Sequence, residues 1–295
     1  MDHLDVAPDN TNPEFEALLN YLKHSHDFDF AGYKRFSLSL RVQKRLQALR
    51  IKSYSDYCAY LKKNPQEFIE LFSTIEINFT SFFRDLAAWN YVGAQIVPQI
   101  IAAKSDSQPI RIWSAGCATG EEAYTLALVL IQALGLEQFH NRVKIFATDI
   151  DSDAINFARR ATYEAKQIAA VPAQLRAQYF SCVNSRYILC PGLRRQVIFG
   201  CQNLIADPPI SGIDLLAYRN VSIYFNIETQ TTVFQRLHRS LNDNGFLLLG
   251  NSEMATNHAN LFIPVSAQHH ILAKVPKKSL KPMLLPGPTI RGIGK

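Results

Sequence analysis

Hydrophobic positions divide the chain into two parts with different spacing. Up to about residue 88 they recur at the spacing of amphipathic helices, and glycine is scarce. This pattern predicts helices over 13–25, 37–50, 53–64 and 65–78. From about residue 110, short apolar runs alternate with helical segments, which is typical of βαβ units in a mostly parallel sheet. The last two predicted strands are expected to form an antiparallel edge, and the full set is 110–115, 142–150, 213–220, 246–251 and 269–275.

Local patterns refine this organisation. Ser37 or Ser39 is the expected N-cap of the second helix. Residues 177–201 hold two alternating apolar runs about a Cys-Pro-Gly turn, which predicts a small antiparallel insertion. We therefore expect an all-α N-terminal domain over 1–88, an α/β domain over 89–276 that contains this insertion, and a flexible basic tail over 277–295.

Composition adds few constraints. The 295 residues are 47% apolar and 19% charged, as in an ordinary soluble globular protein. The net charge of +6 allows an anionic partner without naming one. The N-terminus is too polar and acidic for a signal peptide, and no apolar run reaches the roughly 20 residues that a membrane-spanning helix needs. We therefore expect a cytoplasmic protein without membrane insertion. No metal site is expected either, because the five cysteines form no C-x-x-C pair.

One loop carries the first indication of a ligand. The sequence SAGCATGEE over 114–122 joins a predicted strand to a predicted helix, and its two glycines let the backbone turn tightly and approach a ligand. Asp149 ends the next strand, at the place where dinucleotide-binding folds use an acid to bind ribose hydroxyls. A tight connection alone also explains the glycines. Asp149 is alternatively a helix N-cap, although Asp151 or Ser152 offers the same cap.

The two glutamates of this loop discriminate between ligands. A helix N-terminus favours an anion by a few tenths to about 1 kcal/mol, but Glu121 and Glu122 would repel a pyrophosphate placed there. A ligand with an adenosine ribose, no phosphate and a positive charge fits better. S-adenosylmethionine has this chemistry, because its sulfonium and ammonium groups would gain a charge-assisted contact with a carboxylate. The alternative is that one or both glutamates only cap the helix.

Several motifs in register resemble one known family. They are INFTSFFRD at 77–85, IWSAGCATGEEAYTLAL at 112–128, FATDID at 146–151, YRNVSIYF at 218–225 and GNSE at 250–253. From about residue 14 to 275 the chain resembles the chemotaxis protein methyltransferases, the CheR family. The resemblance implies a Rossmann-like class I methyltransferase domain after an all-α domain, with S-adenosylmethionine as cofactor and S-adenosylhomocysteine as product. It also implies a monomer that methylates glutamate side chains on the cytoplasmic helical domains of chemoreceptors, giving γ-methyl esters.

The resemblance also implies site residues. The positions that match the family's cofactor contacts are Asn78, Thr80, Arg84, Glu121, Asp149, Asn203, Leu204, Arg219 and Asn220. For Asn78 and Thr80 the alternative is a capping or turn role. Arg84 suits a bidentate pair with the methionine carboxylate. Asn203 and Leu204 suit the edge and the face of an adenine. Arg219 and Tyr224 are the catalytic candidates that orient the substrate carboxylate, although Tyr224 is alternatively a packed aromatic residue. A glutamate is already ionised at neutral pH, with a pKa of about 4.3, so no acid–base triad is required.

The predicted helix 37–50 offers a second functional surface. Its apolar stripe is Leu38, Val42, Leu46 and Leu49, and the basic patch on another face is Arg41, Lys44 and Arg45. Alone, such a patch is usually a solvated face. Beside a methyltransferase domain it is a candidate docking surface for an acidic receptor helix. In some family members the inserted β-subdomain also tethers a receptor's C-terminal peptide by strand addition.

Some positions depart from the family pattern. The family often has paired arginines where this chain has Ser39 and Leu40, usually a histidine at Asn251, and often a cysteine at Tyr218. None of these is a carried-over contact, so cofactor binding is expected to be intact. One alternative function is a nucleic-acid methyltransferase, but the chain shows no base-flipping pocket motif and no aromatic–basic stripe, so no nucleic-acid partner is expected. The other is a cofactor-binding signalling module without turnover.

Overall fold

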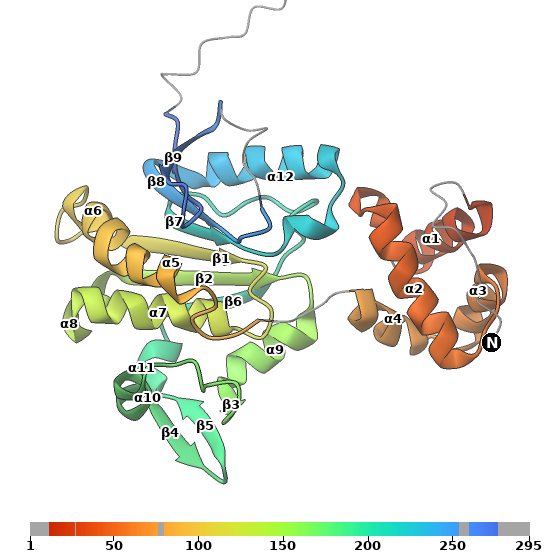
Figure 1. The fold of residues 1–295 in the computed structure, drawn as a ribbon, viewed down its shortest axis with the longest axis horizontal. Coiled ribbons are helices and arrows are strands. Elements are labelled where there is room, and N and C mark those ends of the chain that lie inside the picture. The colour runs from red at the N-terminus through yellow and green to blue at the C-terminus, as the bar shows by residue number, and fades with distance from the viewer. Residues whose placement is uncertain (1–11, 27, 76–79, 254–259, 277–295) are drawn as a thin grey trace, which may run out of the picture.

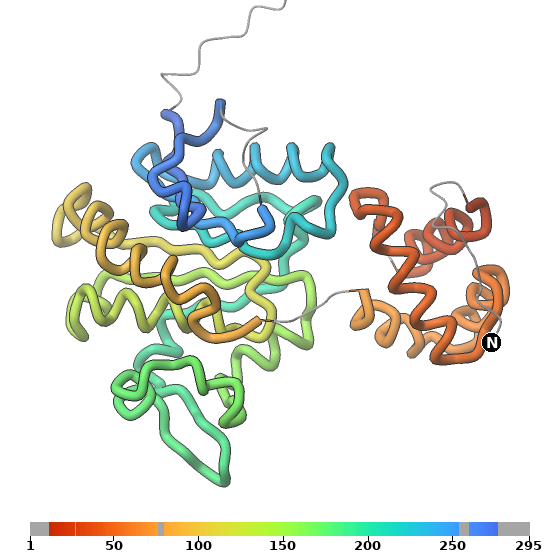
Figure 2. Tube along the Cα trace, viewed as in Figure 1, coloured from red at the N-terminus to blue at the C-terminus, as the bar shows by residue number. Residues whose placement is uncertain are grey.

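The computed structural model describes residues 12–26, 28–75, 80–253 and 260–276 (Figure 1). It consists of a helical bundle beside a larger α/β domain. The bundle lies beyond the end of the sheet toward which the parallel strands run (Figure 2). The predicted tail and Asn78 lie outside the described residues.

The bundle contains α1 (Pro13–His26), α2 (Arg35–Leu49), α3 (Tyr54–Lys63) and α4 (Glu67–Ile75). The apolar stripe predicted on α2 is confirmed, because Leu38, Val42 and Leu46 are buried. The predicted N-cap of α2 is wrong. The helix begins after Lys34, whose backbone N–H donates to the carbonyl of Tyr224 at 2.9 Å, and Ser39 lies inside the helix. A contact with the other domain, rather than a serine, therefore fixes the start of α2.

A mixed sheet forms the centre of the α/β domain. Its strand order is β6-β2-β1-β7-β8-β10-β9. The first five strands pair in parallel, β10 pairs antiparallel with β8, and β9 pairs antiparallel with β10. The strands are β6 (Val197–Cys201), β2 (Val143–Asp149), β1 (Ile110–Ala115), β7 (Ile213–Tyr218), β8 (Leu241–Leu249), β10 (Ile271–Lys274) and β9 (Phe262–Ser266). The predicted parallel sheet with an antiparallel edge is confirmed, and β9 adds a strand that the pattern did not predict.

Helices cover both faces of this sheet (Figure 1). Successive residues of a strand point to opposite faces, so Ile110 and Ile112 join one apolar cluster while Trp113 and Ala115 join the other. The first cluster includes α5 (Leu86–Tyr91), α6 (Val97–Ala102) and α7 (Glu121–Leu134), and α8 (Leu136–Arg142) and α9 (Ser152–Arg160) contact strands β2 and β6. The second includes α12 (Ile227–Ser240) and continues into the N-terminal bundle. Two apolar layers therefore hold the sheet, and one of them joins the two domains.

The expected boundary near residue 88 differs from the packing. Phe82, Phe83 and Trp89 belong to the apolar cluster of the α/β domain. The backbone N–H of Phe83 also donates to the hydroxyl of Thr125 on α7 at 3.1 Å. The segment from residue 80 onward is thus built into the second domain.

The predicted antiparallel insertion exists, but its limits differ. A separate sheet with the order β3-β5-β4 contains β3 (Thr162–Glu164), β4 (Phe180–Val183) and β5 (Arg186–Leu189), and α10 (Ala173–Tyr179) precedes β4. The hairpin turns at Asn184 and Ser185, which have φ of 49° and 60°. The Cys-Pro-Gly segment instead begins α11 (Pro191–Arg194), and the second predicted run is β6 of the main sheet.

Main-chain hydrogen bonds join the two domains. Tyr33 forms a β-bridge with Phe225, and the backbone N–H of Asn226 donates to the carbonyl of Gly32 at 3.0 Å. Gly32 belongs to the short helix η1 (Phe30–Gly32), and the other side of the contact follows η3 (Ser222–Tyr224). A Cβ at Gly32 would lie 2.8 Å from Oγ1 of Thr229, so the close approach needs glycine there. This seam sets the bundle against the carboxyl end of β7.

Candidate active site

A cavity that is partly open to solvent lies at the carboxyl ends of the parallel strands. Open α/β sheets bind ligands at this edge. The loops after β1, β2, β6 and β7 form most of its wall, and the N-terminal domain adds one residue. The lining residues are Tyr33, Thr80, Arg84, Gly116, Ala118, Glu122, Asp149, Ile150, Gln202, Asn203, Leu204, Arg219, Asn220, Val221, Tyr224 and Phe225.

The glycine loop follows β1 and forms one side of this cavity. The backbone N–H groups of Gly116 and Cys117 both donate to the carbonyl of Thr148, at 2.8 and 3.0 Å, which ties the loop to β2. Gly116 has φ of 79°, and a Cβ there would overlap Cγ2 of Val221. Glycine is therefore required both by the left-handed backbone and by the packed side chain from the loop after β7.

Asp149 lies where a ribose-binding acid is expected. It is buried at the end of β2, and its carboxylate accepts from the backbone N–H groups of Ala118 at 2.8 Å and Asp151 at 3.0 Å. The N-cap of α9 is Asp151, which accepts from the N–H groups of its first turn. Asp149 is thus free of that capping role and lines the cavity. Burial raises the pKa of its carboxyl group.

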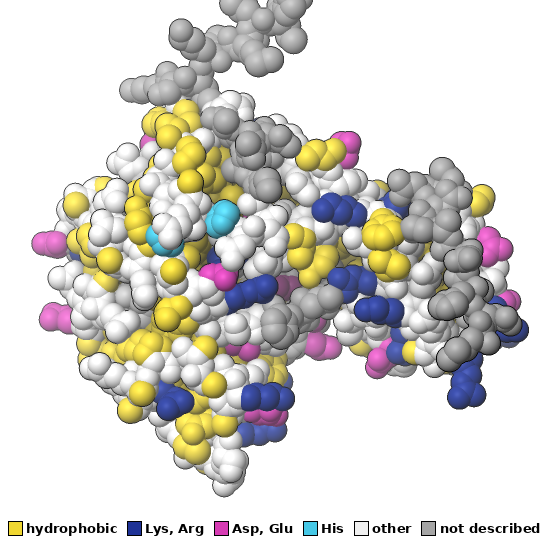
Figure 3. Space-filling view, in the orientation of Figure 1, with side chains coloured by type: hydrophobic (Ala, Val, Ile, Leu, Met, Phe, Trp, Pro, Cys, Tyr) yellow, Lys and Arg dark blue, Asp and Glu magenta, His cyan; other side chains and the backbone are white. Residues whose placement is uncertain are grey.

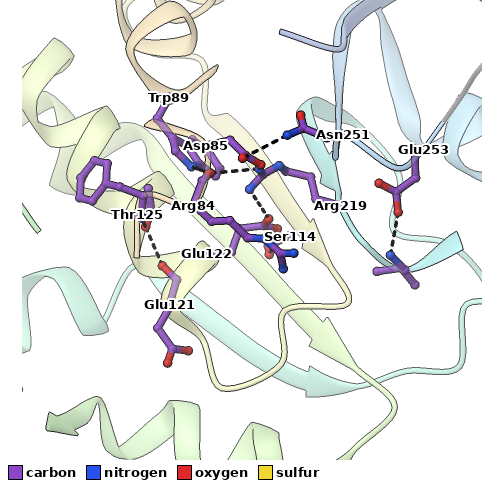
Figure 4. Close-up of polar contacts among 12 residues, drawn as sticks. Arg84, Asp85, Trp89, Ser114, Glu121, Glu122, Thr125, Arg219, Asn251 and Glu253 are labelled. Carbon is purple, nitrogen blue, oxygen red and sulfur yellow. Dashed lines mark hydrogen bonds and ion pairs between the residues drawn. The ribbon is translucent and has the colours of Figure 1, made fainter. Parts of the chain in front are cut away.

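The two loop glutamates differ in their placement relative to the cavity. Glu121 does not line the cavity. Its carboxylate accepts from the hydroxyl of Thr119 at 2.6 Å and from Nε2 of Gln167 at 3.2 Å, and it points away from Arg219 (Figure 4). Glu122 lines the cavity and accepts from the hydroxyl of Ser114 at 2.8 Å. Adjacent helix positions point about 100° apart, which is consistent with this difference in placement.

Arg219 is buried and lies at the centre of an ionic network (Figure 4). Its guanidinium donates to Oδ2 of Asp85 at 2.5 Å and to Oε2 of Glu122 at 3.4 Å. It also donates to the carbonyl of Arg84 at 3.0 Å and lies over the ring of Trp89 at 5.2 Å. Among the described residues, its Nε atom has no hydrogen-bond partner. Two carboxylates therefore outweigh the charge of one arginine, which leaves the network net negative.

Burial raises the pKa of the Glu122 carboxyl, while the nearby charge of Arg219 acts in the opposite direction. Burial likewise raises the pKa of Glu121. The cavity therefore combines Glu122 and Asp149, two carboxylates that are costly to ionise without a cation. Such an arrangement favours a positively charged ligand.

Other predicted contacts also come together here. Thr80 and Arg84 line the cavity from the segment before α5. Asn203 and Leu204 line it from the loop after β6, where the side-chain oxygen of Asn203 accepts from the N–H groups of two following residues. Asn220, with φ of 61°, lines it from the loop after β7. Of the nine carried-over contacts, only Glu121 is placed elsewhere, and Asn78 lies outside the described residues.

The rim of the cavity belongs to both domains. Tyr33 from the bundle and Tyr224 and Phe225 from the α/β domain line it together. The guanidinium carbon of Arg41 on α2 lies 5.5 Å from the centre of the Tyr224 ring. The catalytic candidate Tyr224 and the docking candidate Arg41 are thus in contact.

The predicted docking patch is only partly available. Arg45 donates to both oxygens of the buried Glu67 on α4, at 2.5 and 2.9 Å, and Tyr57 donates to the same carboxylate at 2.8 Å. The guanidinium of Arg45 therefore joins α2 to α4 and is occupied by this ion pair, so it contributes little to a docking surface. Lys44 is exposed, and Arg41 is partly exposed.

Two of the positions that depart from the family pattern lie next to the site. Nδ2 of Asn251 donates to Oδ1 of Asp85 at 3.2 Å, one step from Arg219. The hydroxyl of Tyr218 is buried without a described partner, and burial together with the charge of Glu253 raises its pKa well above the ordinary value. Glu253 accepts from the backbone N–H of Val221 at 2.8 Å and so holds the loop after β7.

The residues that sequence reasoning missed are small or adjacent to known motifs. Gln202, Ile150 and Val221 line the cavity beside predicted contacts. Asp85 follows Arg84 in the FFRD motif, and its partner Arg219 lies far along the chain. A buried arginine implies a nearby acid, but its position in the sequence gives no indication of which one.

The sheet order, with a glycine loop and an acid at adjacent strand ends, is that of an S-adenosylmethionine-dependent methyltransferase domain. A family model described as the CheR methyltransferase SAM-binding domain matches residues 78–271. A second, the CheR methyltransferase all-alpha domain, matches residues 13–75. The chain belongs to the CheR methyltransferase family, and its cofactor is S-adenosylmethionine.

Several curated relatives share this organisation. The chain is 31% identical to chemotaxis protein methyltransferase 2 of Pseudomonas aeruginosa, over 85% of this chain and 90% of that protein. It is 29% identical to a chemotaxis protein methyltransferase of Borreliella burgdorferi, over 85% of this chain and 91% of that protein. It is also 30% identical to an uncharacterised 104.1 kDa protein of Rhodobacter capsulatus, where the match covers 86% of this chain but 27% of that protein.

No helix within the described residues is long and apolar enough to cross a membrane. No group of three or more histidine, cysteine, aspartate or glutamate side chains within them is arranged to hold a metal ion.

Proposed function

We propose that the protein transfers the methyl group of S-adenosylmethionine to glutamate side chains on the helical cytoplasmic domains of chemoreceptors. The observation that carries this proposal is the cavity at the strand ends, which holds the buried carboxylates of Glu122 and Asp149 and whose rim joins the basic helix α2. The family and the names of the relatives support a chemotaxis methyltransferase. The glutamate substrate, the γ-methyl ester product, the monomeric state and the cytoplasmic location belong to the proposal.

The residues fit the cofactor. Glu122 and Asp149 are buried carboxylates with raised pKa values, and a sulfonium and an ammonium group would stabilise their ionised forms. Asp149 also offers oxygens to ribose hydroxyls, and Asn203 and Leu204 offer an edge and a face to an adenine. Arg84 would pair with the methionine carboxylate. In this assignment Glu122 replaces Glu121 as the acidic contact of the loop.

Little acid–base chemistry is required of the protein. Bound S-adenosylmethionine supplies an electrophilic methyl group whose carbon–sulfur bond breaks as the carbon–oxygen bond of the ester forms. The substrate carboxylate is the nucleophile, and it is already ionised at neutral pH because its ordinary pKa is about 4.3. The chain's residues hold the two reactants in line and exclude water, which is the main source of acceleration in such reactions.

The network around Arg219 changes its expected role. Because its guanidinium is already paired with Asp85 and Glu122, we assign Arg219 mainly to positioning Glu122 and the backbone at Arg84. Its Nε atom is buried and has no hydrogen-bond partner among the described residues. Tyr224, at the rim, is the other candidate for orienting the incoming glutamate.

Methyl transfer to purified receptor cytoplasmic fragments tests the proposal. S-adenosylmethionine labelled in its methyl group should give a labelled receptor from which base releases methanol, since esters are base-labile. Replacement of the labelled glutamate by alanine should abolish the label at that position. Base-stable label, label on nucleic acid, or cofactor binding without any labelled receptor would overturn the proposal in favour of another substrate or of a binding module.

A further inference from the structure

The outward face of α2 combines apolar and basic side chains. Phe36 and Leu40 lie one helical turn apart and are 52% and 43% exposed. Lys44 lies one turn further along the same line and is also exposed, while Leu38 and Val42 on the other side are buried. Hydrophobic and basic side chains accordingly gather together over the bundle beside the α/β domain (Figure 3). Adjacent exposed apolar side chains of this size mark a contact surface more often than isolated ones do.

This face continues into the rim of the cavity. A shallow groove along α2 is lined by Ser37, Leu40, Arg41, Gln43, Lys44 and Gln47. Arg41, next to Leu40, lies over Tyr224, which lines the cavity. A molecule that places a carboxylate in the cavity and extends over α2 would therefore pass Arg41 and reach Leu40.

The occupant can be defined from charge and continuity. The surface offers two apolar side chains and the charges of Arg41 and Lys44, and the chain has no acidic residue between Ala31 and Lys52. A complementary partner presents an apolar side chain next to acidic ones. At the middle of this face the chain has the buried Ser39 and the exposed Leu40. Recognition on this face is therefore expected to combine apolar burial with charge.

We infer that Phe36 and Leu40 form an apolar subsite that selects the substrate helix. The selected helix carries an apolar residue about one turn from the methylated glutamate, on the same face, and acidic residues opposite Lys44. This mode is a helix that lays one face into a groove, anchored by residues at helical spacing. The inference rests on the proposed function, and it adds the determinant of substrate choice.

The test uses the full-length protein and a receptor cytoplasmic fragment that it methylates. The double variant Phe36→Ser/Leu40→Ser should lose about tenfold in kcat/KM at both low and high salt, because burial of apolar surface is insensitive to screening. Lys44→Ala should lose activity at low salt only. The matched control is Ile69→Ser, which removes a side chain that is 51% exposed on α4 of the same bundle. All variants should bind S-adenosylmethionine as the unaltered protein does.

A change on the receptor links the subsite to its partner. Replacing the apolar residue one turn from the glutamate by serine should reduce kcat/KM for the unaltered protein about tenfold and leave the double variant unchanged, since coupled residues are not additive. Equal loss in both proteins would overturn the inference.

The remaining outcomes separate the two proposals. If the double variant matches Ile69→Ser, the subsite is wrong while receptor methylation stands. If the unaltered protein labels no receptor fragment, the proposed function is wrong, and a receptor helix is then also wrong as the partner that binds this face. If sedimentation shows a dimer that the double variant abolishes, the face binds a second copy of the chain instead, which also overturns the inference.

Discussion

Asn251 donates a hydrogen bond from Nδ2 to Oδ1 of Asp85 at 3.2 Å, across two segments that are far apart in the sequence. The second oxygen of Asp85 accepts from Arg219, so the loop after β8 reaches the centre of the site through one carboxylate. A position where the family usually has histidine therefore belongs to the network that orders the cavity.

The first prediction concerns this contact. Asn251→Leu removes the donor and should raise the Kd for S-adenosylmethionine several-fold, in line with the roughly 1 kcal/mol of a typical hydrogen bond. Asn251→His should stay close to the unaltered protein, because an imidazole N–H can donate to the same oxygen. Calorimetric titration measures both. Equal affinities for the leucine and histidine variants would show that Asn251 plays no part in ordering the site.

The second prediction separates the two glutamates of the loop. Glu122→Gln should raise the Kd for S-adenosylmethionine by about tenfold or more, because it removes a buried negative charge from the cavity. Glu121→Gln should change the Kd little, because that side chain faces Thr119 and Gln167. The two isosteric variants are controls for each other. A larger loss for Glu121→Gln would restore the assignment made from the sequence.

The third prediction is a pH dependence. In the ligand-free protein burial raises the pKa values of Glu122 and Asp149, and a bound cation favours their ionised forms. Affinity for S-adenosylmethionine should therefore fall as pH falls through the raised values, at a pH above the ordinary glutamate pKa of about 4.3. Binding should release protons in this range, which calorimetry in buffers of different ionisation enthalpy measures.

The same two carboxyl groups also make the folding stability of the ligand-free protein depend on pH. A carboxyl whose pKa is raised by folding contributes stability below its unfolded pKa, and that contribution is lost as pH rises through the folded value. The stabilisation against unfolding that the bound cofactor confers should be smaller in acid than at neutral pH, because the affinity for the cofactor falls as these carboxyl groups take up protons. Glu122→Gln should flatten the profile of affinity against pH, and an unchanged profile would assign the dependence to Asp149.

The fourth prediction tests the glycine loop. Gly116→Ala should lower the free energy of unfolding by about 2–4 kcal/mol, because the left-handed backbone disfavours a Cβ and the packed Val221 would overlap it. Gly135→Ala is the control for a backbone cost without a clash, since Gly135 has φ of 76° and ψ of 166° and no atom within 4 Å of the Cβ position. It should cost about 1–3 kcal/mol, because that backbone region strongly favours glycine.

A second substitution identifies the clash. Val221→Ala in the Gly116→Ala background should recover part of the loss, because it removes the overlapping methyl groups. Thermal unfolding measures all three variants. If Gly116→Ala costs no more than Gly135→Ala, the packing role of Val221 is wrong.

The fifth prediction tests the removal of Arg45 from the docking surface. Arg45→Ala leaves the buried Glu67 without its bidentate partner and should cost about 2–4 kcal/mol in the free energy of unfolding. Lys44→Ala, one residue away and exposed, should stay within about 0.5 kcal/mol of the unaltered protein. Denaturant titration compares them. Similar stabilities would indicate that Arg45 is a surface residue available to a partner.

The hydrophobic pattern predicted most of the sheet because its strands are buried runs. Strand β1 begins and ends as expected, and α7 follows it without a gap other than the glycine loop. Strand β9 was missed because it lies at the edge, contains Pro264, and buries only Phe262. The run that forms β6 was assigned to the insertion, because an edge strand and a strand in a small hairpin have the same alternating pattern.

The sequence motifs predicted which loops line the cavity better than they predicted which side chains contact one another there. Asp149 and Arg219 lie where strand ends were expected to place them. Spacing along the sequence gave no way to tell which of Glu121 and Glu122 lines the cavity, because that placement depends on the rotation of the first turn of α7 against Ser114. The ion pair between Arg45 and Glu67 joins two helices, and no periodic pattern reports such a contact.

The seam between the domains has an evolutionary consequence. It is formed in large part by main-chain groups of Gly32, Tyr33, Lys34 and residues 224–226, which bond regardless of side-chain identity. The outer face of α2 is then free to diverge while its distance from the reacting centre stays constant. Under the proposed function, a few changes on this face would alter the choice of substrate helix without disturbing the residues that line the cavity, and chimeras that exchange the bundle should retain turnover provided that residue 32 stays glycine.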